Sequence, residues 1–488
     1  MSEEILINVT PEETRVALVE NGMLQEIFIE RSEQHDTVGS LYQGKVLRVL
    51  PGMQAAFVDI GARRSAFLHV SDMREARAIG AVDGEPLIPI ERLLREGQTL
   101  LVQVVKDSLG GKGARLSTKI SIPSRYLVYM PDSAHVGVSA RIEDEGERAR
   151  LKQVVTALRT DDLPGGYIVR TAGEGASTES LRRDMLMLAK IWQVIAEKAA
   201  STPGGRRIHD DLPLVLRTLR DLVDADVERV RIDSPETFKR VSQFVDAFLP
   251  DADVRLEQYT ADRPIFDLFG VEDEIQRALD RRVPLKSGGY LVIDQTESMT
   301  TIDVNTGGYV GHRTLEETIF KTNIEAVQAI ARQLRLRNLG GIIIIDFIDM
   351  EDEDHRRQVL RALEKCLERD PARTKLSGVS ALGLVEMTRK RTRESLGRLL
   401  CEPCAVCGGR GYTKSVDTIC FEILREIIRA ARQFDARELL VLAADNVVTR
   451  LLEDKATNLA ELEQSLGRPI RLQAQSMYYT DQYDVVML

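Results

Sequence analysis

One stretch of the sequence, residues 289–347, constrains the fold more than any other. It holds an apolar strand segment (GYLVI), a more polar one (TTIDVNT), a long segment with helical periodicity and a second apolar strand segment (GGIIIIDF). Strand segments joined through a helix of this length are typical of a crossover in an α/β sheet. Thr314 and Glu317 form a capping box that starts the helix, and its apolar spacing continues to Asn338.

Acidic and amide side chains stand at the ends of these strand segments. The strand period of two puts Asp303 and Asn305 on one face, and Asp346 ends the second apolar strand. Ligand crevices of open α/β sheets lie at strand ends, so Asp303 and Asp346 are predicted to face one cleft. Carboxylates beside an amide suit Mg²⁺ and hydrolysis of a phosphodiester. In the alternative interpretation, Asp346 and Asp349 cap the following helix and Asp303 lies in a turn.

Residues 39–119 show short strand segments broken by glycine and proline, the rhythm of a small Greek-key barrel. Phe57 and Phe67 lie on the more polar face of two of these strands, and His69 shares the face of Phe67. Exposed rings on such a barrel stack on unpaired bases, and Lys112 in a glycine-rich loop is placed to reach phosphate. The pattern predicts a site for single-stranded nucleic acid; the alternative is that both rings belong to the core.

The formal net charge of −10 means that any RNA affinity must come from local basic surfaces. Arg170 and Thr171 follow the strand segment GYIV beside a glycine-containing turn, which suits a terminal phosphate. The densest basic segment is EMTRKRTRESL, from Glu386 to Leu396. It either follows an RNA backbone or forms a solvated helix face.

Cys404 and Cys407 form a C-x-x-C pair followed by GGRG, the pattern of a zinc knuckle. A closed zinc site needs four ligands. Cys401 offers a possible third, but the sequence has no second C-x-x-C and no histidine after His355. Two chains that each donate the pair would complete the site, which predicts a homodimer or a larger oligomer. A redox pair is the competing interpretation, and the thioredoxin-like β-α-β context that it needs is not evident.

The acidic start MSEEILINVT and the absence of a long apolar run indicate a cytoplasmic protein without stable membrane association.

These pieces, in this order, resemble the ribonuclease E/G family along essentially the whole chain. The resemblance rests on QAAFVDIG, GGKGAR, IVRTAGEG, PIFDLF, LKSGGYLVIDQTE, TIDVNTG, GGIIIIDFIDM, LGLVEMTRKR and C-x-x-C-x-G-x-G. It implies a multidomain α+β and α/β fold. The implied parts are a ribonuclease-H-like subdomain (1–38 and 214–278), an inserted OB-fold RNA-binding barrel (39–119), a 5′-sensor (120–213), a deoxyribonuclease-I-like catalytic domain (279–399), a zinc link (400–415) and a small C-terminal αβ domain (416–488).

The resemblance also implies a role for each matching residue. Implied are Mg²⁺ ligands (Asp303, Asp346) with Asn305 beside them, RNA-gripping residues (Phe57, Phe67, Lys112), a 5′-monophosphate pocket (Arg170, Thr171, Val128, Arg141) and zinc ligands shared between chains (Cys404, Cys407). Ser124 departs from a glycine found near this pocket in some relatives, and Cys401 lies outside the minimal cysteine pattern.

The implied activity is that of an endoribonuclease. It cuts AU-rich single-stranded RNA, is stimulated by a 5′-monophosphate and leaves 5′-phosphate and 3′-hydroxyl ends. The implied substrates are ribosomal RNA precursors, with 16S 5′-end maturation, and messenger RNA. We expect no long scaffold tail for partner enzymes. The rival hypothesis is a noncatalytic RNA-binding or filament-forming protein, in which the acids cap helices and zinc drives assembly.

Overall fold

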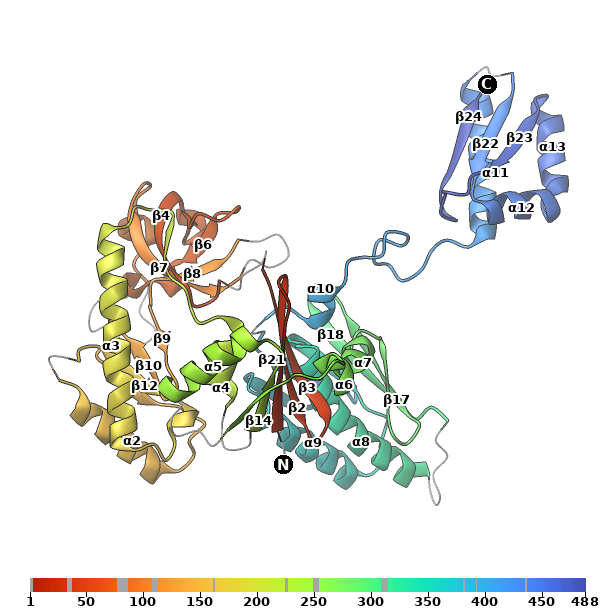
Figure 1. Ribbon diagram of the computed structural model, residues 1–488. Coiled ribbons are helices and arrows are strands. Elements are labelled where there is room, and N and C mark those ends of the chain that lie inside the picture. The colour runs from red at the N-terminus through yellow and green to blue at the C-terminus, as the bar shows by residue number, and fades with distance from the viewer. Residues whose placement is uncertain are drawn as a thin grey trace. The chain divides into compact units, whose positions relative to one another are not determined.

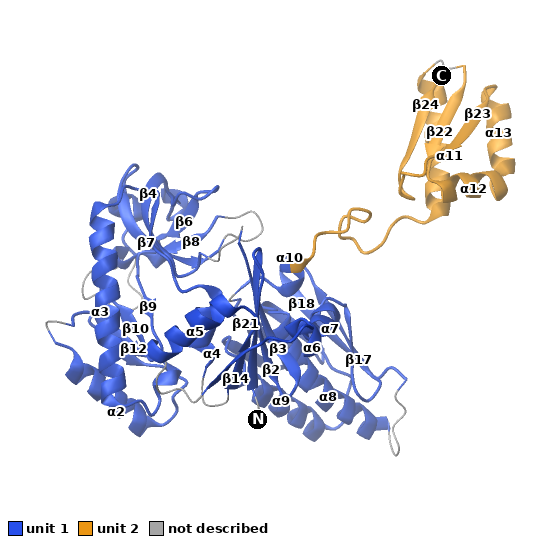
Figure 2. Ribbon diagram, in the orientation of Figure 1, with its two compact units in different colours: residues 1–399 blue, residues 400–488 orange. Residues whose placement is uncertain are grey.

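The computed structural model divides the chain into two compact units, residues 1–399 and 400–488 (Figures 1 and 2). It describes residues 3–32, 37–76, 87–107, 113–160, 163–223, 227–248, 254–308, 315–380, 382–391, 393–434 and 437–488. Within these residues, each sheet has a buried apolar core of its own. Separate cores are expected because a single core does not grow to the size of such a chain.

The N-terminal meander shares a sheet with a later part of the chain. Its strands are β1 (Glu3–Val9), β2 (Glu13–Glu20) and β3 (Met23–Arg31), and the later strands are β14 (Val227–Ile232) and β15 (Arg255–Gln258). The order is β15-β14-β1-β2-β3, with β14 parallel to β1. Asn21 and Gly22, between β2 and β3, have φ of 49° and 78°, the left-handed values of a tight hairpin turn. Helices α4 (Leu214–Leu222) and α5 (Pro235–Phe248) pack on this sheet, and α6 (Ile265–Leu268) and α7 (Val271–Arg277) follow.

A closed five-stranded barrel follows the meander, as the strand rhythm predicts. Its strands are β4 (Leu41–Leu50), β5 (Ala55–Asp59), β6 (Ala66–His69), β7 (Thr99–Lys106) and β8 (Arg115–Ser117). Strand β4 pairs with both β5 and β7, which closes the order β4-β5-β6-β8-β7. Strand β13 (Arg206–His209) also pairs with β4, so a segment distant in sequence extends the barrel sheet. The short helices are η1 (Pro51–Met53), η2 (Val70–Asp72), η3 (Arg74–Ala76) and α1 (Ile90–Leu93).

A four-stranded sheet separates the barrel from β13 in the sequence. It has the order β11-β12-β10-β9, from β9 (Ile122–Pro123), β10 (Leu127–Met130), β11 (Val136–Val138) and β12 (Gly166–Val169). Helices α2 (Glu145–Leu158) and α3 (Thr178–Ser201) pack against it, and η4 (Thr171–Gly173) follows β12. The fully buried rings of Tyr129 and Tyr167 lie 5.1 Å apart between centroids in this core.

A six-stranded sheet contains the strand segments that were predicted within residues 289–347. Its order is β16-β17-β18-β19-β21-β20, from β16 (Arg282–Pro284), β17 (Tyr290–Gln295), β18 (Met299–Asn305), β19 (Gly341–Asp346), β20 (Thr374–Val379) and β21 (Val385–Arg389). Helices α8 (Leu315–Leu336) and α9 (Glu353–Leu367) bury one face, and α10 (Leu396–Leu400) follows β21. The other face, called the open face below, exposes Thr301, Asp303, Ile342, Asp346 and Thr388.

Helix α8 is the predicted crossover, because it joins β18 to the parallel strand β19. It ends at Leu336, and Asn338 just beyond it has a left-handed φ of 47°, in agreement with the predicted end. Thr314 of the predicted capping box lies outside the described residues.

The second unit has helices α11 (Val416–Gln433), α12 (Asp445–Glu453) and α13 (Ala456–Leu466) and strands β22 (Leu439–Ala443), β23 (Ile470–Ala474) and β24 (Tyr483–Met487). The sheet order is β23-β22-β24, and β22 runs parallel to β23 through α12 and α13. This is a β-α-β crossover, which the sequence analysis did not predict. It begins at β22, far beyond Cys404 and Cys407, so the cysteine pair itself lies outside it, as expected.

None of the helices that the structure describes combines the length and the apolar character of a membrane span.

Candidate functional site

The register of β18 and β19 brings two aspartates together. Asp303 and Asp346 are direct partners in this parallel pairing, and both are exposed on the open face. Neighbouring strands lie about 5 Å apart, so the two carboxylates border one small space. Asn305 Nδ2 donates a hydrogen bond of 2.8 Å to Asp303 Oδ2 and holds that carboxylate in place. We call Asp303 and Asp346 the acid pair.

Electrostatic repulsion acts on the acid pair. Partial burial, then the negative charges of Asp303 and Asp349, raise the pKa of Asp346. A bound cation would remove this penalty by favouring the charged form of both carboxylates. The donor set of two carboxylates and an amide, open to water, fits Mg²⁺, which takes few protein oxygens and keeps several waters.

The helix-capping interpretation of these aspartates does not agree with the structure. The residue that caps α9 is Asp352, whose Oδ1 accepts the backbone N–H of Asp354 at 2.7 Å. Asp346 belongs to β19, and Asp303 lies inside β18 rather than in a turn.

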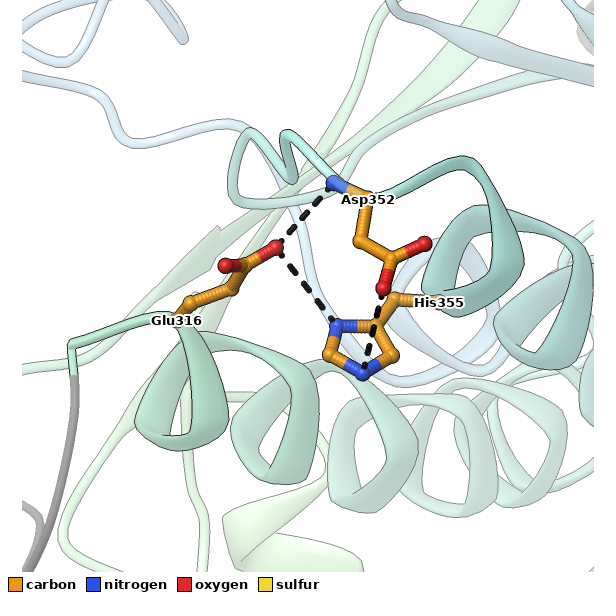
Figure 3. Close-up of side chains that lie close together, drawn as sticks. All are labelled: Glu316, Asp352 and His355. Atoms are coloured by element: carbon orange, nitrogen blue, oxygen red, sulfur yellow. Dashed lines mark hydrogen bonds and ion pairs between the residues drawn. The ribbon is translucent and has the colours of Figure 1, made fainter.

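A cluster of Glu316, Asp352 and His355 joins the starts of α8 and α9 (Figure 3). Glu316 Oε1 accepts the backbone N–H of Asp352 at 3.1 Å and lies 3.8 Å from His355 Nδ1. The imidazole of His355 stacks on the ring of Phe320, with centroids 4.3 Å apart. Both carboxylates thus accept backbone N–H groups, and the positive ends of two helices oppose a cation here. The cluster fixes the two helix starts, and no sequence pattern pointed to it.

The two phenylalanines of the barrel lie outside its core. Phe57 and Phe67 are direct partners on β5 and β6, with ring centroids 6.2 Å apart and an edge-to-face arrangement. Both are half-buried, whereas their neighbours of opposite alternation form the barrel core. The interpretation of the rings as core is therefore wrong. His69 stacks on Phe67 at 6.4 Å and extends the aromatic strip. Lys112 lies outside the described residues.

Arg170 and Thr171 stand together at the end of β12. The Arg170 guanidinium donates to the carbonyl of Ser124 at 2.5 Å and to Asp221 Oδ1 at 2.7 Å. Thr171 Oγ1 lies 3.3 Å from Ser139 Oγ. Although burial opposes it, pairing with Arg220 and Arg170 lowers the pKa of Asp221, so this anchor stays charged. The result is a fixed guanidinium on Arg170, and the next residue, Thr171, pairs its hydroxyl with that of Ser139.

Val128 and Ser124 are the next two residues expected at or near the phosphate pocket. Val128 is half-buried on β10, which pairs with β12. The buried Ser124 side chain bonds to Asp184 and to the carbonyl of Leu127, while the Ser124 carbonyl holds Arg170. The serine in place of glycine is therefore accommodated in the pocket wall.

Arg141 reaches across to the six-stranded sheet. Its guanidinium donates to the carbonyls of Asp370 at 3.1 Å and Pro371 at 2.6 Å, in the connection between α9 and β20. The Asp370 carboxylate is buried in an ion pair of 2.6 Å with Arg389 of β21. No sequence signal predicted this link, because it joins segments over 200 positions apart.

Cys404 and Cys407 lie in a turn before α11. The backbone N–H of Gly411 donates to Cys407 Sγ at 3.4 Å, and backbone N–H groups of Gly411 and Gly409 lower the pKa of the Cys407 thiol. Such donors favour the thiolate, which is the form that binds metal. Among the described residues, no third thiol, imidazole or carboxylate lies close enough to close a site on this pair.

Two family models match the chain. One, "Ribonuclease E/G family", matches residues 121–392, and the other, "RNase E/G, Thioredoxin-like domain", matches residues 403–488. The second match agrees with the β-α-β crossover, so a thioredoxin-like domain lies in the same unit as the cysteine pair. Nevertheless, Cys407 precedes Val416, the first residue of α11, by nine positions and follows no strand of its unit.

The chain is also similar to curated proteins along its whole length. It is 53% identical over 491 residues to "Ribonuclease G" of Escherichia coli (strain K12), with 100% of both chains covered. Identity to "Ribonuclease G" of Haemophilus influenzae is 51%, with 99% of both covered. Identity to "Ribonuclease E" of Escherichia coli (strain K12) is 38%, with 94% of this chain and 44% of that protein covered. The chain therefore belongs to the ribonuclease E/G family.

Proposed function

We propose that this protein is an endoribonuclease that hydrolyses single-stranded RNA with Mg²⁺ held by Asp303 and Asp346. The observation that carries the proposal is the direct pairing of two exposed aspartates on the open face, with Asn305 bonded to one of them. Membership of a family whose relatives are named ribonucleases supports the same activity.

In the proposed mechanism, Asp303 and Asp346 hold the ion and Asn305 keeps Asp303 oriented toward it. Bound Mg²⁺ would polarise the phosphodiester, help to generate hydroxide and stabilise the leaving oxygen. Phe57 and Phe67 stack on unpaired bases, so that the substrate is a single strand. Loss of the 3′ oxygen as leaving group gives products with 5′-phosphate and 3′-hydroxyl ends.

We further propose that Arg170 and Thr171, with Val128 beside them, bind a 5′-monophosphate and stimulate cleavage. A guanidinium whose position is fixed by Ser124 and Asp221 binds phosphate without first paying side-chain entropy. The natural substrates that we propose are AU-rich single-stranded regions of messenger RNA and of 16S ribosomal RNA precursors, in the cytoplasm. The proposed architecture around the sites is a ribonuclease-H-like subdomain and a deoxyribonuclease-I-like catalytic domain.

For the second unit, we propose a structural Zn²⁺ bound by Cys404 and Cys407 from each of two chains. The N–H donors around Cys407 support thiolate ligation, and one chain offers only half of a tetrahedral set. The proposed assembly is a homodimer or a larger oligomer.

The test compares Mg²⁺-dependent cutting of a short AU-rich RNA with a 5′-monophosphate or a 5′-hydroxyl, by wild type and by Asp303→Asn. We expect internal cleavage that is lost in the variant and faster with the monophosphate. Equal cleavage rates on both substrates would contradict the 5′-phosphate pocket but would still support the nuclease activity. RNA binding without any cleavage by wild type would favour a noncatalytic RNA-binding protein.

A further inference from the structure

An open groove of about 640 Å³ lies on the six-stranded sheet at the end opposite the acid pair. It is lined by Glu297, Ser298, Gly341, Ile342, Arg373, Lys375, Thr388, Arg389, Lys390 and Arg391. We call it the basic groove. It contains part of the basic segment of the sequence, which is therefore a strand and its continuation rather than a helix face.

The basic groove and the acid pair share one face of the sheet. Met299 pairs with Ile342 at the start of β18 and β19, and Asp303 pairs with Asp346 four positions later. At about 3.3 Å per residue, the two sites are therefore roughly 13 Å apart along the strands. Ile342 pairs with Thr388, which also pairs with Lys375, so these side chains project from the open face. A ligand lying across this face meets both sites.

Three cations of the groove have no acidic partner among the described residues. Arg373, Lys375 and Lys390 are exposed, and none of them forms an ion pair with a residue that the structure describes. Arg391 uses its Nε to donate 2.8 Å to the carbonyl of Gly340. Glu297 is the single acid of the lining, whereas Arg389 is buried in its ion pair with Asp370.

This chemistry fits the phosphates of a nucleic-acid backbone. Free ammonium and guanidinium groups next to the hydroxyls of Ser298 and Thr388 match a run of phosphate oxygens. In a chain with a net charge of −10, a local cluster of unpaired cations attracts a polyanion to this part of the surface. The cations lie up to two strands, or about 10 Å, to the side of β19, because Lys375 belongs to β20 and Lys390 follows β21. A stacked strand advances about 3.4 Å per nucleotide, so roughly four to five nucleotides span the distance to the acid pair.

We propose that the basic groove is a second RNA-backbone site, which holds the strand roughly four to five nucleotides from the bond at the acid pair. The part about the cleaved bond rests on the proposed function, whereas backbone binding does not.

The test uses the full-length chain with Asp303→Asn, so that RNA stays intact, and measures affinity for a 20-nucleotide single strand between 50 and 300 mM salt. The test variant is Lys375→Ala/Lys390→Ala. The matched control is Arg361→Ala/Lys365→Ala, which removes the same charge from exposed positions of α9, on the covered side of the same sheet. The salt slope is the fall in the logarithm of the affinity per unit of the logarithm of the salt concentration, and each neutralised phosphate of a single strand contributes about 0.7 to it. We expect the slope of the test variant to be smaller by about 1.4 and its affinity to be ~10-fold weaker near 0.15 M salt. The control stays unchanged.

Two further arms separate the outcomes. Lys375→Arg/Lys390→Arg should retain affinity and slope, and thermal melting should match wild type for every variant. Three results would overturn the proposal. They are unchanged binding by the alanine variant, an equal loss of affinity in the control, and a loss of affinity that accompanies a change in oligomer mass.

Cleavage is measured with the same surface substitutions and an intact Asp303. We expect the alanine variant to cut a four-nucleotide RNA, which is too short to reach the groove, normally and a 20-nucleotide RNA about 10-fold less efficiently at low concentration. Wild type that binds through the groove but never cuts would remove the proposed function and leave the groove. If the alanine variant binds and cleaves RNA as wild type does, the groove proposal is overturned and the proposed function stands.

Discussion

Asp303 and Asp346 form a site because each has a defined neighbour. Asp303 is fixed by Asn305 on its own strand, while partial burial and the negative charges of Asp303 and Asp349 disfavour the charged form of Asp346. A side chain that orients a metal ligand contributes to metal affinity without binding the ion itself. The role of Asn305 can therefore be separated from that of the aspartates.

We expect Asn305→Ala to slow cleavage about 10- to 100-fold and to recover part of the loss at higher Mg²⁺, because Asp303 would lose its orientation. Thr301→Ala is the control, since Thr301 is exposed two positions earlier on the same face of β18. Cleavage rates over a Mg²⁺ titration measure the effect. Equal behaviour of the two variants would contradict a specific role for Asn305.

Glu147 shows a residue-scale effect of pH. Hydrogen bonds from the Arg150 guanidinium and from the backbone N–H of Gly175 lower the pKa of Glu147 from 4.5 to about 2. A lowered folded-state pKa stabilises the fold above pH 4.5, and this stability is lost as the pH falls toward 2. Because the partner side chain of Arg150 is 40% exposed and solvent screens the ion pair, we expect Glu147→Gln to cost about 1 kcal/mol or less at pH 7. Melting temperatures of wild type and variant should converge between pH 4 and 2. A gap that is constant over this range would refute the assignment.

At the scale of elements, a buried ion pair holds the edge of the six-stranded sheet. Asp370 precedes β20, Arg389 belongs to β21, and their side chains are 2% and 3% exposed. Arg389 also donates to the carbonyl of Leu339 just before β19, and Arg141 donates to the carbonyl of Asp370. The Asp370–Arg389 ion pair and its hydrogen bonds therefore link three parts of the fold. These are the connection between α9 and β20, the segment that leads into β19, and the segment between β11 and α2 that carries Arg141.

We expect Asp370→Ala to lower the free energy of unfolding by about 3–5 kcal/mol, because it leaves the Arg389 charge buried without its partner. Asp354→Ala, which removes an exposed ion pair with Arg357 on α9, should cost less than about 1 kcal/mol. Urea unfolding of both variants measures the difference. Similar losses for the two would mean that the buried pair contributes no more than a surface pair.

At the scale of the whole molecule, two units with separate cores are joined through the segment that carries the cysteines. One chain supplies two thiolate ligands, so the proposed zinc site depends on a second copy. Assembly and catalysis then reside in different units and can be disturbed one at a time.

We expect Cys404→Ser/Cys407→Ser to remove bound zinc and to shift the protein to smaller species in analytical ultracentrifugation. Cys401→Ser should leave both unchanged, since Cys401 has no place in the proposed ligand set. The measurements are the zinc content and the sedimentation of each variant. Oligomers of unchanged mass in the double variant would rule out zinc as the link between chains.

The sequence by itself determined the features that depend on local periodicity and turn chemistry. These include the Asn21-Gly22 hairpin, the outward face of Phe57 and Phe67, and the crossover helix that ends near Asn338. Its motifs also indicated the family. Each of these signals is carried by neighbouring residues, so no long-range pairing has to be known to recognise it.

Only the tertiary structure decided which distant segments meet. Four features depend on contacts between segments that are distant in the sequence. They are the register that sets Asp303 against Asp346, the addition of β13 to the barrel, the hydrogen bond from Arg141 to Asp370 and the β-α-β crossover of the second unit. The same holds for the basic groove, which stands at the opposite end of the sheet from the acid pair. Strand pairing and ion pairing are nonlocal, and a sequence pattern with a period of two or 3.6 residues does not specify the partner of a strand or of a charge.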